Sequence, residues 1–532
     1  MEATVDTPYG RLAGGVLDGV HRFLGISYAA PPTGPNRLRS PRPPAPWSGV
    51  RAARRIGPAS LQTLAGAQTW LNDPIDRQDE DCLTLNVWVP ADADHAPILV
   101  WFHGGATRNG HGGMAAIDGE TLARRHGIMV VTVNYRLGAL GGLAHPDLVD
   151  EVTGHCANWG MQDKIAALEW VRACGAAFGG DTASVTIAGQ SSGATNVVLI
   201  AQNPACRHLF ARVIAQSPPL FREPMFADLA GAAEYAEALA AECGTTVSGL
   251  RALDGPVLMA REAAFLRQSP LAHRFGRPRT APTLDGRLVA AWPHDGRAAA
   301  VPLLIGFTAD EALFWYDLKL PDGTALTTLI PPADESRLAA EIERLIALHY
   351  SFLGPPDAEA VVRRYREGAD GGSDLRGLWL AIYTDLVFRA PILRYALRHA
   401  ERAPAYVYEF AWPLAAPVFG APHAADVPFV FGTTGHPHLG PKIGEGSTAT
   451  SEAMMALWAG FVRSGVPSAE GLPLWEPLVP AGALAAMVIG ARKVPACFGP
   501  LPRPGPLRAW PALLPSLPIE PRPSRTRLAD GA

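Results

Sequence analysis

Short apolar runs alternate along this chain with stretches in which apolar residues recur at helical spacing. Residues 128–133 form an almost wholly apolar run, which is typical of a strand buried on both faces. Further strand-like runs cover residues 97–102, 185–188, 212–215, 301–306 and 406–410. By contrast, Ile165, Leu168 and Val171 repeat at the spacing of one helix face. Strands that alternate with helices predict an α/β fold with a mostly parallel, doubly wound central sheet and helices on both faces.

One of these apolar runs leads into residues 189–193, with the sequence Gly-Gln-Ser-Ser-Gly, and a helix-like stretch follows from Ala194. A serine hydroxyl is a weak nucleophile at neutral pH. It therefore needs a tight turn that holds it near a base and near N–H groups that receive negative charge. Glycines at both ends let such a turn close without Cβ clashes. The pattern predicts a nucleophile elbow with Ser191 at its apex, whereas the alternative is a serine that only supports a tight corner.

Residues able to complete an acyl-transfer site follow two other predicted strands. One run leads into residues 103–106, His-Gly-Gly-Ala, whose backbone N–H groups can form an oxyanion hole. Another run ends shortly before the adjacent acids Asp310 and Glu311, and His423 lies farther along the chain. The order serine, acid, histidine is that of an α/β-hydrolase triad and differs from the orders in chymotrypsin and subtilisin. The order alone leaves open which of the two acids belongs to the triad.

Together these segments resemble the type-B carboxylesterases, a family that includes bacterial para-nitrobenzyl esterases, cholinesterases and the non-catalytic neuroligins. The resemblance extends over most of the chain and rests on several long motifs in the family's order. The motifs lie at residues 23–32, 46–51, 80–88, 158–163, 178–181 and 472–475. The resemblance implies an α/β-hydrolase fold with long loop insertions. We expect one such domain at residues 1–500 and an irregular, proline-rich tail at residues 501–532.

The resemblance also implies roles for residues of the site. Ser191 would attack the ester carbonyl, with His423 as its base. Glu311 matches the family's acid position, which favours it over Asp310 as the residue that orients the imidazole. His103 is expected to support the oxyanion loop. The oxyanion would be held by the backbone N–H groups of Gly105, Ala106 and Ser192. This set of residues predicts hydrolysis of a carboxylic ester through an acyl-enzyme, without a metal or an organic cofactor.

The chain departs from the family pattern around the same loops. Gln190 replaces the family's usual glutamate beside the nucleophile, and Ser192 replaces its usual alanine. Ala106 replaces the third glycine of the oxyanion loop, and Pro218 stiffens the turn after Ser217. No catalytic group is lost, because the oxyanion donors are backbone N–H groups. The shape of the pocket and the support of the triad are expected to differ.

Five residues near these loops are candidates for the substrate pocket, although each could equally pack in the core. They are Trp70, Arg108, Met114, Phe314 and Trp315. Trp70 lies two residues farther from Cys82 than the choline-binding tryptophan of cholinesterases lies from its matching cysteine, so a cation–π site is expected to be misplaced. Neutral esters should therefore be preferred to choline esters. Arg108 could bind a substrate carboxylate or could be a solvated surface arginine.

Composition narrows the possible functions. The 46 Lys and Arg residues nearly balance the 50 Asp and Glu residues, which argues against partners such as nucleic acids or acidic membranes.

The N-terminus lacks the basic and apolar segments of a signal peptide, and no apolar run is long enough to span a membrane. The six cysteines show no metal-ligand spacing. In secreted relatives the cysteine at the position of Cys82 often pairs with an upstream cysteine. None precedes Cys82 here, which favours the cytoplasm.

A small-molecule ester is therefore the expected partner, and the sequence does not predict the oligomeric state. Two alternative functions remain. An acyltransferase would use the same triad to pass the acyl group to another alcohol or amine. A non-catalytic binding protein, like the neuroligins, would carry this fold with a broken triad, which the intact set of residues in this chain disfavours.

Overall fold

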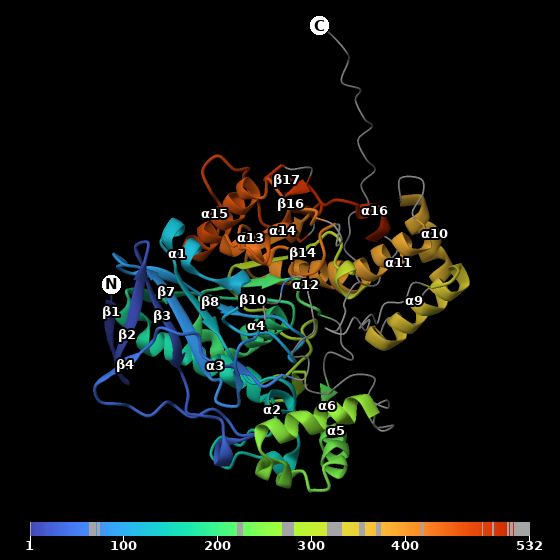
Figure 1. The fold of residues 1–532 in the computed structure, drawn as a ribbon. Helices are drawn as coiled ribbons and strands as arrows, with labels where there is room; N and C mark the ends of the chain where they lie inside the picture. The colour runs from blue at the N-terminus through green and yellow to red at the C-terminus, as the bar shows by residue number, and fades with distance from the viewer. Residues whose placement is uncertain are drawn as a thin grey trace.

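The computed structural model describes residues 2–62, 71, 75–220, 227–268, 281–316, 332–350, 357–368, 374–415, 420–480, 482–491, 494–507, 510 and 514. Within these residues, 13 strands form one large sheet (Figure 1). Their order across the sheet is β1 (Glu2–Thr7), β2 (Gly10–Leu17), β3 (Val20–Ser27), β7 (Thr84–Pro90), β9 (Met129–Val133), β8 (Ala96–Phe102), β10 (Gly180–Gln190), β11 (Arg212–Gln216), β14 (Leu303–Thr308), β15 (Ala405–Phe410), β16 (Ala485–Ile489) and β17 (Ala496–Pro500), with β4 (Val50–Ala52) paired to β2. The strands from β9 to β16 run parallel, and antiparallel pairs flank them at both ends. The predicted mostly parallel sheet is confirmed.

The six apolar runs of the sequence fall in β8, β9, β10, β11, β14 and β15. Both faces of the sheet are buried. Along β8, Ile98 and Val100 join one hydrophobic core, and Leu99 and Trp101 join the other. Helices α3 (Trp159–Cys174), α4 (Ser192–Gln202) and α12 (Ala390–Ala400) cover the first core, whereas α1 (Glu120–His126), α13 (Val427–Phe431) and α15 (Thr448–Ser464) cover the second (Figure 1). The sheet is therefore doubly wound.

The remaining elements surround this sheet. Helices α2 (Gly138–Gly142), α5 (Leu229–Glu242) and α6 (Gly255–Gln268) share a smaller core at the bottom of Figure 1. Helices α9 (Glu335–His349), α10 (Ala358–Gly368) and α11 (Leu375–Thr384) lie near one another at the right of Figure 1, and one turn of π-helix (Asp385–Arg389), called the π-turn below, joins α11 to α12. The other short elements are α8 (Leu313–Tyr316), α14 (Gly440–Ile443), β5 (Ala59–Ser60), β6 (Gln78–Asp79), β12 (Ala227–Asp228) and β13 (Thr283–Leu284).

The register of the parallel strands gathers several loops at one edge of the sheet. Gly189 of β10 lies beside Phe102 of β8, and Gln190 lies beside Gln216 of β11. Gln216 in turn pairs with Gly306 of β14. The loops that follow these strands therefore leave the same carboxyl-terminal edge, where open α/β sheets bind their ligands.

The first part of the segment after residue 500 packs against the domain. It includes the short helix α16 (Pro504–Leu507). Four apolar side chains are buried in the first core: Leu501, Leu507, Trp510 and Leu514. Trp510 also donates a hydrogen bond from Nε1 to Tyr365 Oη at 2.9 Å. Large apolar side chains can thus be buried even where prolines prevent long helices, and the expected boundary of the domain at residue 500 stays a prediction. The residues after 514 lie outside the described part of the chain.

In the part of the chain that the structure describes, no helix is both long and apolar enough to cross a membrane. The same residues contain no group of three or more His, Cys, Asp or Glu side chains that could hold a metal ion. The six cysteines, all of them described, are free.

Candidate active site

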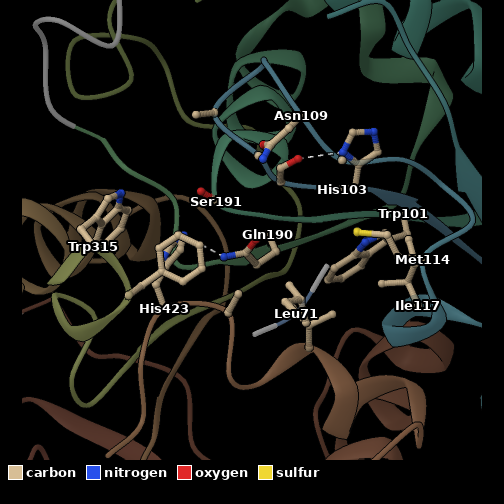
Figure 2. Close-up of a pocket in the computed structure, with 17 residues that line it drawn as sticks. Leu71, Trp101, His103, Asn109, Met114, Ile117, Gln190, Ser191, Trp315 and His423 are labelled. Atoms are coloured by element: carbon tan, nitrogen blue, oxygen red, sulfur yellow. Dashed lines mark hydrogen bonds between the residues drawn. The ribbon is translucent and has the colours of Figure 1, made fainter. Parts of the chain in front are cut away.

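Ser191 lies at a sharp turn between β10 and α4 (Figure 2). Its backbone has φ 56° and ψ -128°, a conformation that costs a non-glycine residue about 1–3 kcal/mol. Two hydrogen bonds hold the turn. Ser191 N–H donates to Gln216 O at 2.9 Å, and Thr195 N–H donates to Ser191 O at 2.9 Å. A Cβ on Gly193 would lie 2.2 Å from Phe102 O, so the helix can approach β8 this closely only with glycine there. The turn has the geometry of the predicted nucleophile elbow.

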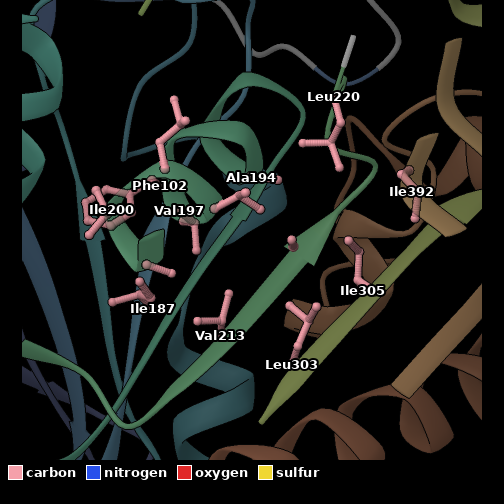
Figure 3. Close-up of a cluster of buried hydrophobic side chains, with 14 of the residues drawn as sticks. Phe102, Ile187, Ala194, Val197, Ile200, Val213, Leu220, Leu303, Ile305 and Ile392 are labelled. Atoms are coloured by element: carbon pink, nitrogen blue, oxygen red, sulfur yellow. The ribbon is translucent and has the colours of Figure 1, made fainter. Parts of the chain in front are cut away.

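Apolar packing fixes α4 on the sheet. Val197 and Ile200 of α4 belong to the same core as Ile187 of β10 and Val213 of β11 (Figure 3). Each side chain of this size contributes about 1.5–3 kcal/mol when it is fully buried. This packing offsets the strain at Ser191 and holds the start of the helix against the ends of the strands.

His423 and Glu311 meet beside the same turn. Nδ1 of His423 lies 2.5 Å from Oε2 of Glu311, and both side chains are buried. The other oxygen of Glu311 accepts a hydrogen bond from Thr308 N–H at 2.8 Å. Because an ionised carboxylate can only accept hydrogen bonds, Nδ1 carries the proton, and Nε2 of the neutral imidazole presents a lone pair. This is the tautomer that a base for a serine hydroxyl requires.

Asp310, the neighbouring acid, binds a different partner. Its Oδ2 accepts a hydrogen bond from Ala421 N–H at 2.9 Å, and its own N–H donates to Ala421 O at 3.0 Å. Asp310 therefore ties the loop before His423 to the loop after β14. Of the two adjacent acids, Glu311 is the one that contacts the imidazole, and its role as the triad acid stays a prediction.

Nε2 of His423, the nitrogen that faces away from Glu311, lies 2.9 Å from Nε2 of Gln190 (Figure 2). Because this imidazole nitrogen presents a lone pair, the amide of Gln190 is the donor of the hydrogen bond. Gln190 lines the same cavity as Ser191 and His423. Gln190 stands out in the sequence as a departure from the family pattern, but the sequence does not predict this contact.

Aromatic rings enclose His423. Its ring centroid lies 4.8 Å from that of Trp315, 5.0 Å from that of Phe388 and 5.6 Å from that of Phe314. Trp315 in turn stacks on Phe388 at 5.3 Å. Phe388 belongs to the π-turn between α11 and α12, a feature that is frequent at functional sites. Phe388 was not among the residues predicted for the site.

The loop after β8 passes beside Ser191. Gly105 and Ala106 line the cavity at this point, with φ 109° and 55°. A Cβ on Gly105 would lie 2.0 Å from Asn109 O, so the loop requires glycine there. Gly105 O accepts hydrogen bonds from the N–H groups of Arg108 and Asn109 at 2.9 and 3.0 Å, which closes the turn. The backbone of Gly105 and Ala106 is thus held at the cavity wall, as the expected oxyanion hole requires.

Two further side chains brace this loop. Ser192 is 1% exposed, and its Oγ accepts a hydrogen bond from Thr107 N–H at 3.2 Å, a contact that alanine could not make. His103 donates from Nδ1 to Gly104 O at 2.7 Å. Burial lowers the pKa of His103 to about 3, so its ring is neutral. Tyr135 stacks on that ring at 4.3 Å and donates to His103 O at 2.6 Å. His103 therefore has a structural position in the loop.

A cavity of about 170 Å³ opens at Ser191 and His423 (Figure 2). One wall is apolar and consists of Leu71, Trp101, Met114, Ile117 and Val427. Among the described residues that line the cavity, none is Asp, Glu, Lys or Arg. Apolar cavities of about 150 Å³ bind a benzene ring, so an aryl or short alkyl group fits this space.

The predicted pocket residues fall into three groups. Met114, Phe314 and Trp315 line the cavity. Arg108 is not among the described residues that line the cavity. Its positive charge instead acts on the buried carboxyl of Glu262. Burial raises the pKa of Glu262, and the charge of Arg108 partly lowers it again. Trp70 lies outside the described residues. The apolar wall residues other than Met114 were not predicted, because residues at a pocket wall follow the same pattern as residues of the core.

A second buried carboxyl lies close to the triad candidates. Oδ2 of Asp426 accepts hydrogen bonds from Tyr408 Oη at 2.6 Å and from Gln216 Nε2 at 2.8 Å. Burial raises the pKa of Asp426 to about 6; the negative charge of Glu311 also raises it, whereas these hydrogen bonds lower it. Asp426 precedes the first residue of α13, so this network anchors the segment that carries His423.

The chain matches known proteins over most of its length. The model of the Carboxylesterase family matches residues 1–494. The chain is 31% identical over 501 residues to the phenmedipham hydrolase of Pseudarthrobacter oxydans, with 91% of this chain and 94% of the relative covered. It is 32% identical over 486 residues to the para-nitrobenzyl esterase of Bacillus subtilis, with 88% of this chain and 91% of the relative covered.

The structure also matches solved esterases. It superposes on a carboxylesterase of Geobacillus stearothermophilus with a TM-score of 0.78 and 31% identity, covering 95% of this chain and 99% of that one. The TM-score with a PNB esterase is 0.77 at 29% identity, covering 96% of this chain and 100% of that one. The fold is therefore the α/β-hydrolase fold that the resemblance implied.

Proposed function

The chain belongs to the carboxylesterase family, and from this premise we propose that it hydrolyses carboxylic esters through an acyl-enzyme formed on Ser191. Its relatives are named as hydrolases and esterases, and the chain is a carboxylic-ester hydrolase. The observation that carries the mechanism is the buried contact between His423 and Glu311 beside the turn at Ser191.

In the proposed mechanism, His423 takes the proton of Ser191 as the serine oxygen attacks the ester carbonyl. Glu311 keeps the other imidazole proton on Nδ1 and stabilises the imidazolium that forms. The tetrahedral oxyanion is held by backbone N–H groups, and losing one such donor costs about 3–4 kcal/mol of barrier in serine hydrolases. The donors are those of Gly105, Ala106 and Ser192.

The imidazolium then protonates the leaving alcohol, which leaves an acyl group on Ser191. In the second half of the reaction His423 activates a water molecule, which attacks the acyl carbonyl and releases the acid. An acyltransferase would share the first half and differ only in the group that accepts the acyl chain. Product analysis therefore distinguishes the two functions.

Turnover of p-nitrophenyl butyrate tests the proposal. An acyl-enzyme that is hydrolysed more slowly than it forms gives an initial burst of p-nitrophenol equal to the amount of active enzyme. Butyric acid should account for all the p-nitrophenol released, also in the presence of added alcohols. A butyrate ester of the added alcohol as the main product would identify an acyltransferase. Release of p-nitrophenol no faster than in buffer would contradict an esterase.

We expect neutral esters to be hydrolysed with a higher kcat/KM than choline esters of the same acid. No carboxylate lines the described cavity, and moving a cation from water into an apolar site without one is costly. Acetylcholine and 3,3-dimethylbutyl acetate have the same shape and differ in charge, so their comparison isolates this effect. The neutral ester should be favoured by about tenfold or more. A higher kcat/KM for acetylcholine would show that the cavity accepts cations.

A further inference from the structure

The amide of Gln190 is hydrogen-bonded to Nε2 of His423, the nitrogen that accepts the proton of Ser191 in the proposed mechanism. Nδ1 of His423 lies 2.5 Å from Glu311, and Nε2 lies 2.9 Å from the amide nitrogen of Gln190. Both ring nitrogens are therefore hydrogen-bonded before any substrate binds. The lone pair that would accept the proton of Ser191 already accepts a hydrogen bond from an amide N–H, which fixes the direction of the imidazole and has to give way when the serine proton is transferred.

Gln190 is held in this position from its other side. A Cβ on Gly104 would lie 2.4 Å from Oε1 of Gln190, so the amide oxygen lies against the backbone of the oxyanion loop. Gln190 is also 4% exposed, which leaves little room for water to take over its hydrogen bonds. The amide therefore lies between the imidazole and the oxyanion loop. Rotation about its terminal torsion, which is roughly two-fold, exchanges the nitrogen and the oxygen without needing more space.

We propose that Gln190 is a positioning residue that supports both protonation states of His423, an inference that rests on the proposed function. With the neutral imidazole, the amide N–H donates to Nε2. Once His423 has taken the proton of Ser191, Nε2–H becomes a donor, and the amide turns to present Oε1 as the acceptor. The proton moves from Ser191 to His423 and from there to the leaving alcohol, and Gln190 only exchanges a donor for an acceptor.

This exchange has a consequence for the pH range of activity. An amide forms hydrogen bonds of similar strength with the neutral and the protonated imidazole, so it favours neither protonation state of His423. A carboxylate in the same place would accept a hydrogen bond only from the imidazolium and would attract its charge, which favours the protonated form. Among the described residues, Glu311 contacts His423 directly, and two further ionisable groups, Asp426 just before α13 and Tyr408 of β15, interact electrostatically with this pair. Gln190 therefore keeps His423 available as a base at a lower pH than glutamate would.

Two variants at this position separate the proposed role from a structural one. Gln190→Glu keeps the size of the side chain, but its carboxylate can only accept hydrogen bonds. It should move the acidic limb of the pH profile of kcat/KM upward by about one unit or more. Gln190→Met keeps the length without a polar group. Its acidic limb should stay within about 0.3 units of the wild type, and kcat should fall about tenfold with little change in KM, because the imidazole is less well oriented.

The matched control is Gln202→Glu, at the far end of α4, about 15 Å along the helix. Gln202 donates a hydrogen bond from Nε2 to Pro293 O at 2.7 Å, so this variant also replaces an amide donor by a carboxylate. It should keep the wild-type pH profile. An acidic limb of Gln190→Glu that coincides with the wild type, or full kcat in Gln190→Met, would overturn the inference. If Gln190→Glu does not fold, the kcat of Gln190→Met decides. A wild-type protein that hydrolyses no ester would instead refute the proposed function.

Discussion

Replacing Ser191 with alanine is expected to abolish ester turnover without unfolding the protein. Loss of the nucleophile of a serine triad lowers kcat by about 10⁶, because the base and the oxyanion hole then have no group to activate. Alanine at φ 56° carries the same Cβ as serine, so the backbone strain does not change. The melting temperature should therefore stay within about 2 °C of the wild type. Initial rates with p-nitrophenyl butyrate measure the loss.

The adjacent serine provides the comparison. Ser192→Ala removes the hydroxyl that accepts the hydrogen bond from Thr107 N–H, and the loss of such a bond costs about 1 kcal/mol. We expect a loss of about tenfold or less in kcat, because the backbone N–H of residue 192 remains. Activity of Ser191→Ala above about 1% of the wild type, or a larger loss in Ser192→Ala, would place the nucleophile elsewhere.

The second large effect is expected at Glu311. Gln at this position keeps the shape of the side chain but removes the charge that stabilises the imidazolium. It can also offer an N–H to Nδ1, which favours the wrong tautomer of His423. In serine triads the equivalent change lowers kcat by about 10⁴. We expect this loss for Glu311→Gln in steady-state kinetics at a pH where the wild type is fully active.

Asp310→Asn is the matched variant for this change. Its side-chain oxygen can still accept the hydrogen bond from Ala421 N–H, so the loop before His423 should keep its position. The expected loss in kcat is about tenfold or less. If Asp310→Asn loses more activity than Glu311→Gln while both keep the wild-type melting temperature, the triad acid is Asp310.

The sheet could be predicted from the sequence because its strands are buried on both faces. Residues 128–133 and 185–188 are almost wholly apolar, and they form β9 and β10, which lie on either side of β8 in the parallel part of the sheet. The turn at Ser191 was predictable for a related reason, since an apolar run, a glycine-flanked serine and a helical stretch follow one another directly. Both features depend on local sequence alone.

The directions of side chains beside the site depend on backbone turns that the pattern does not specify. Arg108 follows the oxyanion loop in sequence and was therefore a candidate for the pocket. Ala106 and Thr107 both have positive φ, at 55° and 59°, so the chain turns sharply just before Arg108. Its charge consequently acts on Glu262 and not in the cavity. The contact between Gln190 and His423 was missed for the same reason.

Contacts between segments far apart in sequence could not be predicted either. Phe388 reaches His423 from a π-turn, in which one extra residue shifts the direction of the following side chains, and apolar spacing does not reveal such a turn. Trp510 follows a proline-rich stretch, and its ring is buried beside Tyr365, a contact that the sequence pattern does not reveal. In both cases the position is set by space available in the tertiary structure.

The role of Ser191 as the nucleophile is tested most directly by covalent labelling with a fluorophosphonate. This reagent modifies a serine only where a base and an oxyanion hole activate it. Mass spectrometry of the wild-type protein should show one adduct, located on Ser191, with turnover lost in proportion to labelling. The Ser191→Ala protein should show none. An adduct on any other residue that accompanies the loss of activity, or one that persists in Ser191→Ala, would contradict the assignment.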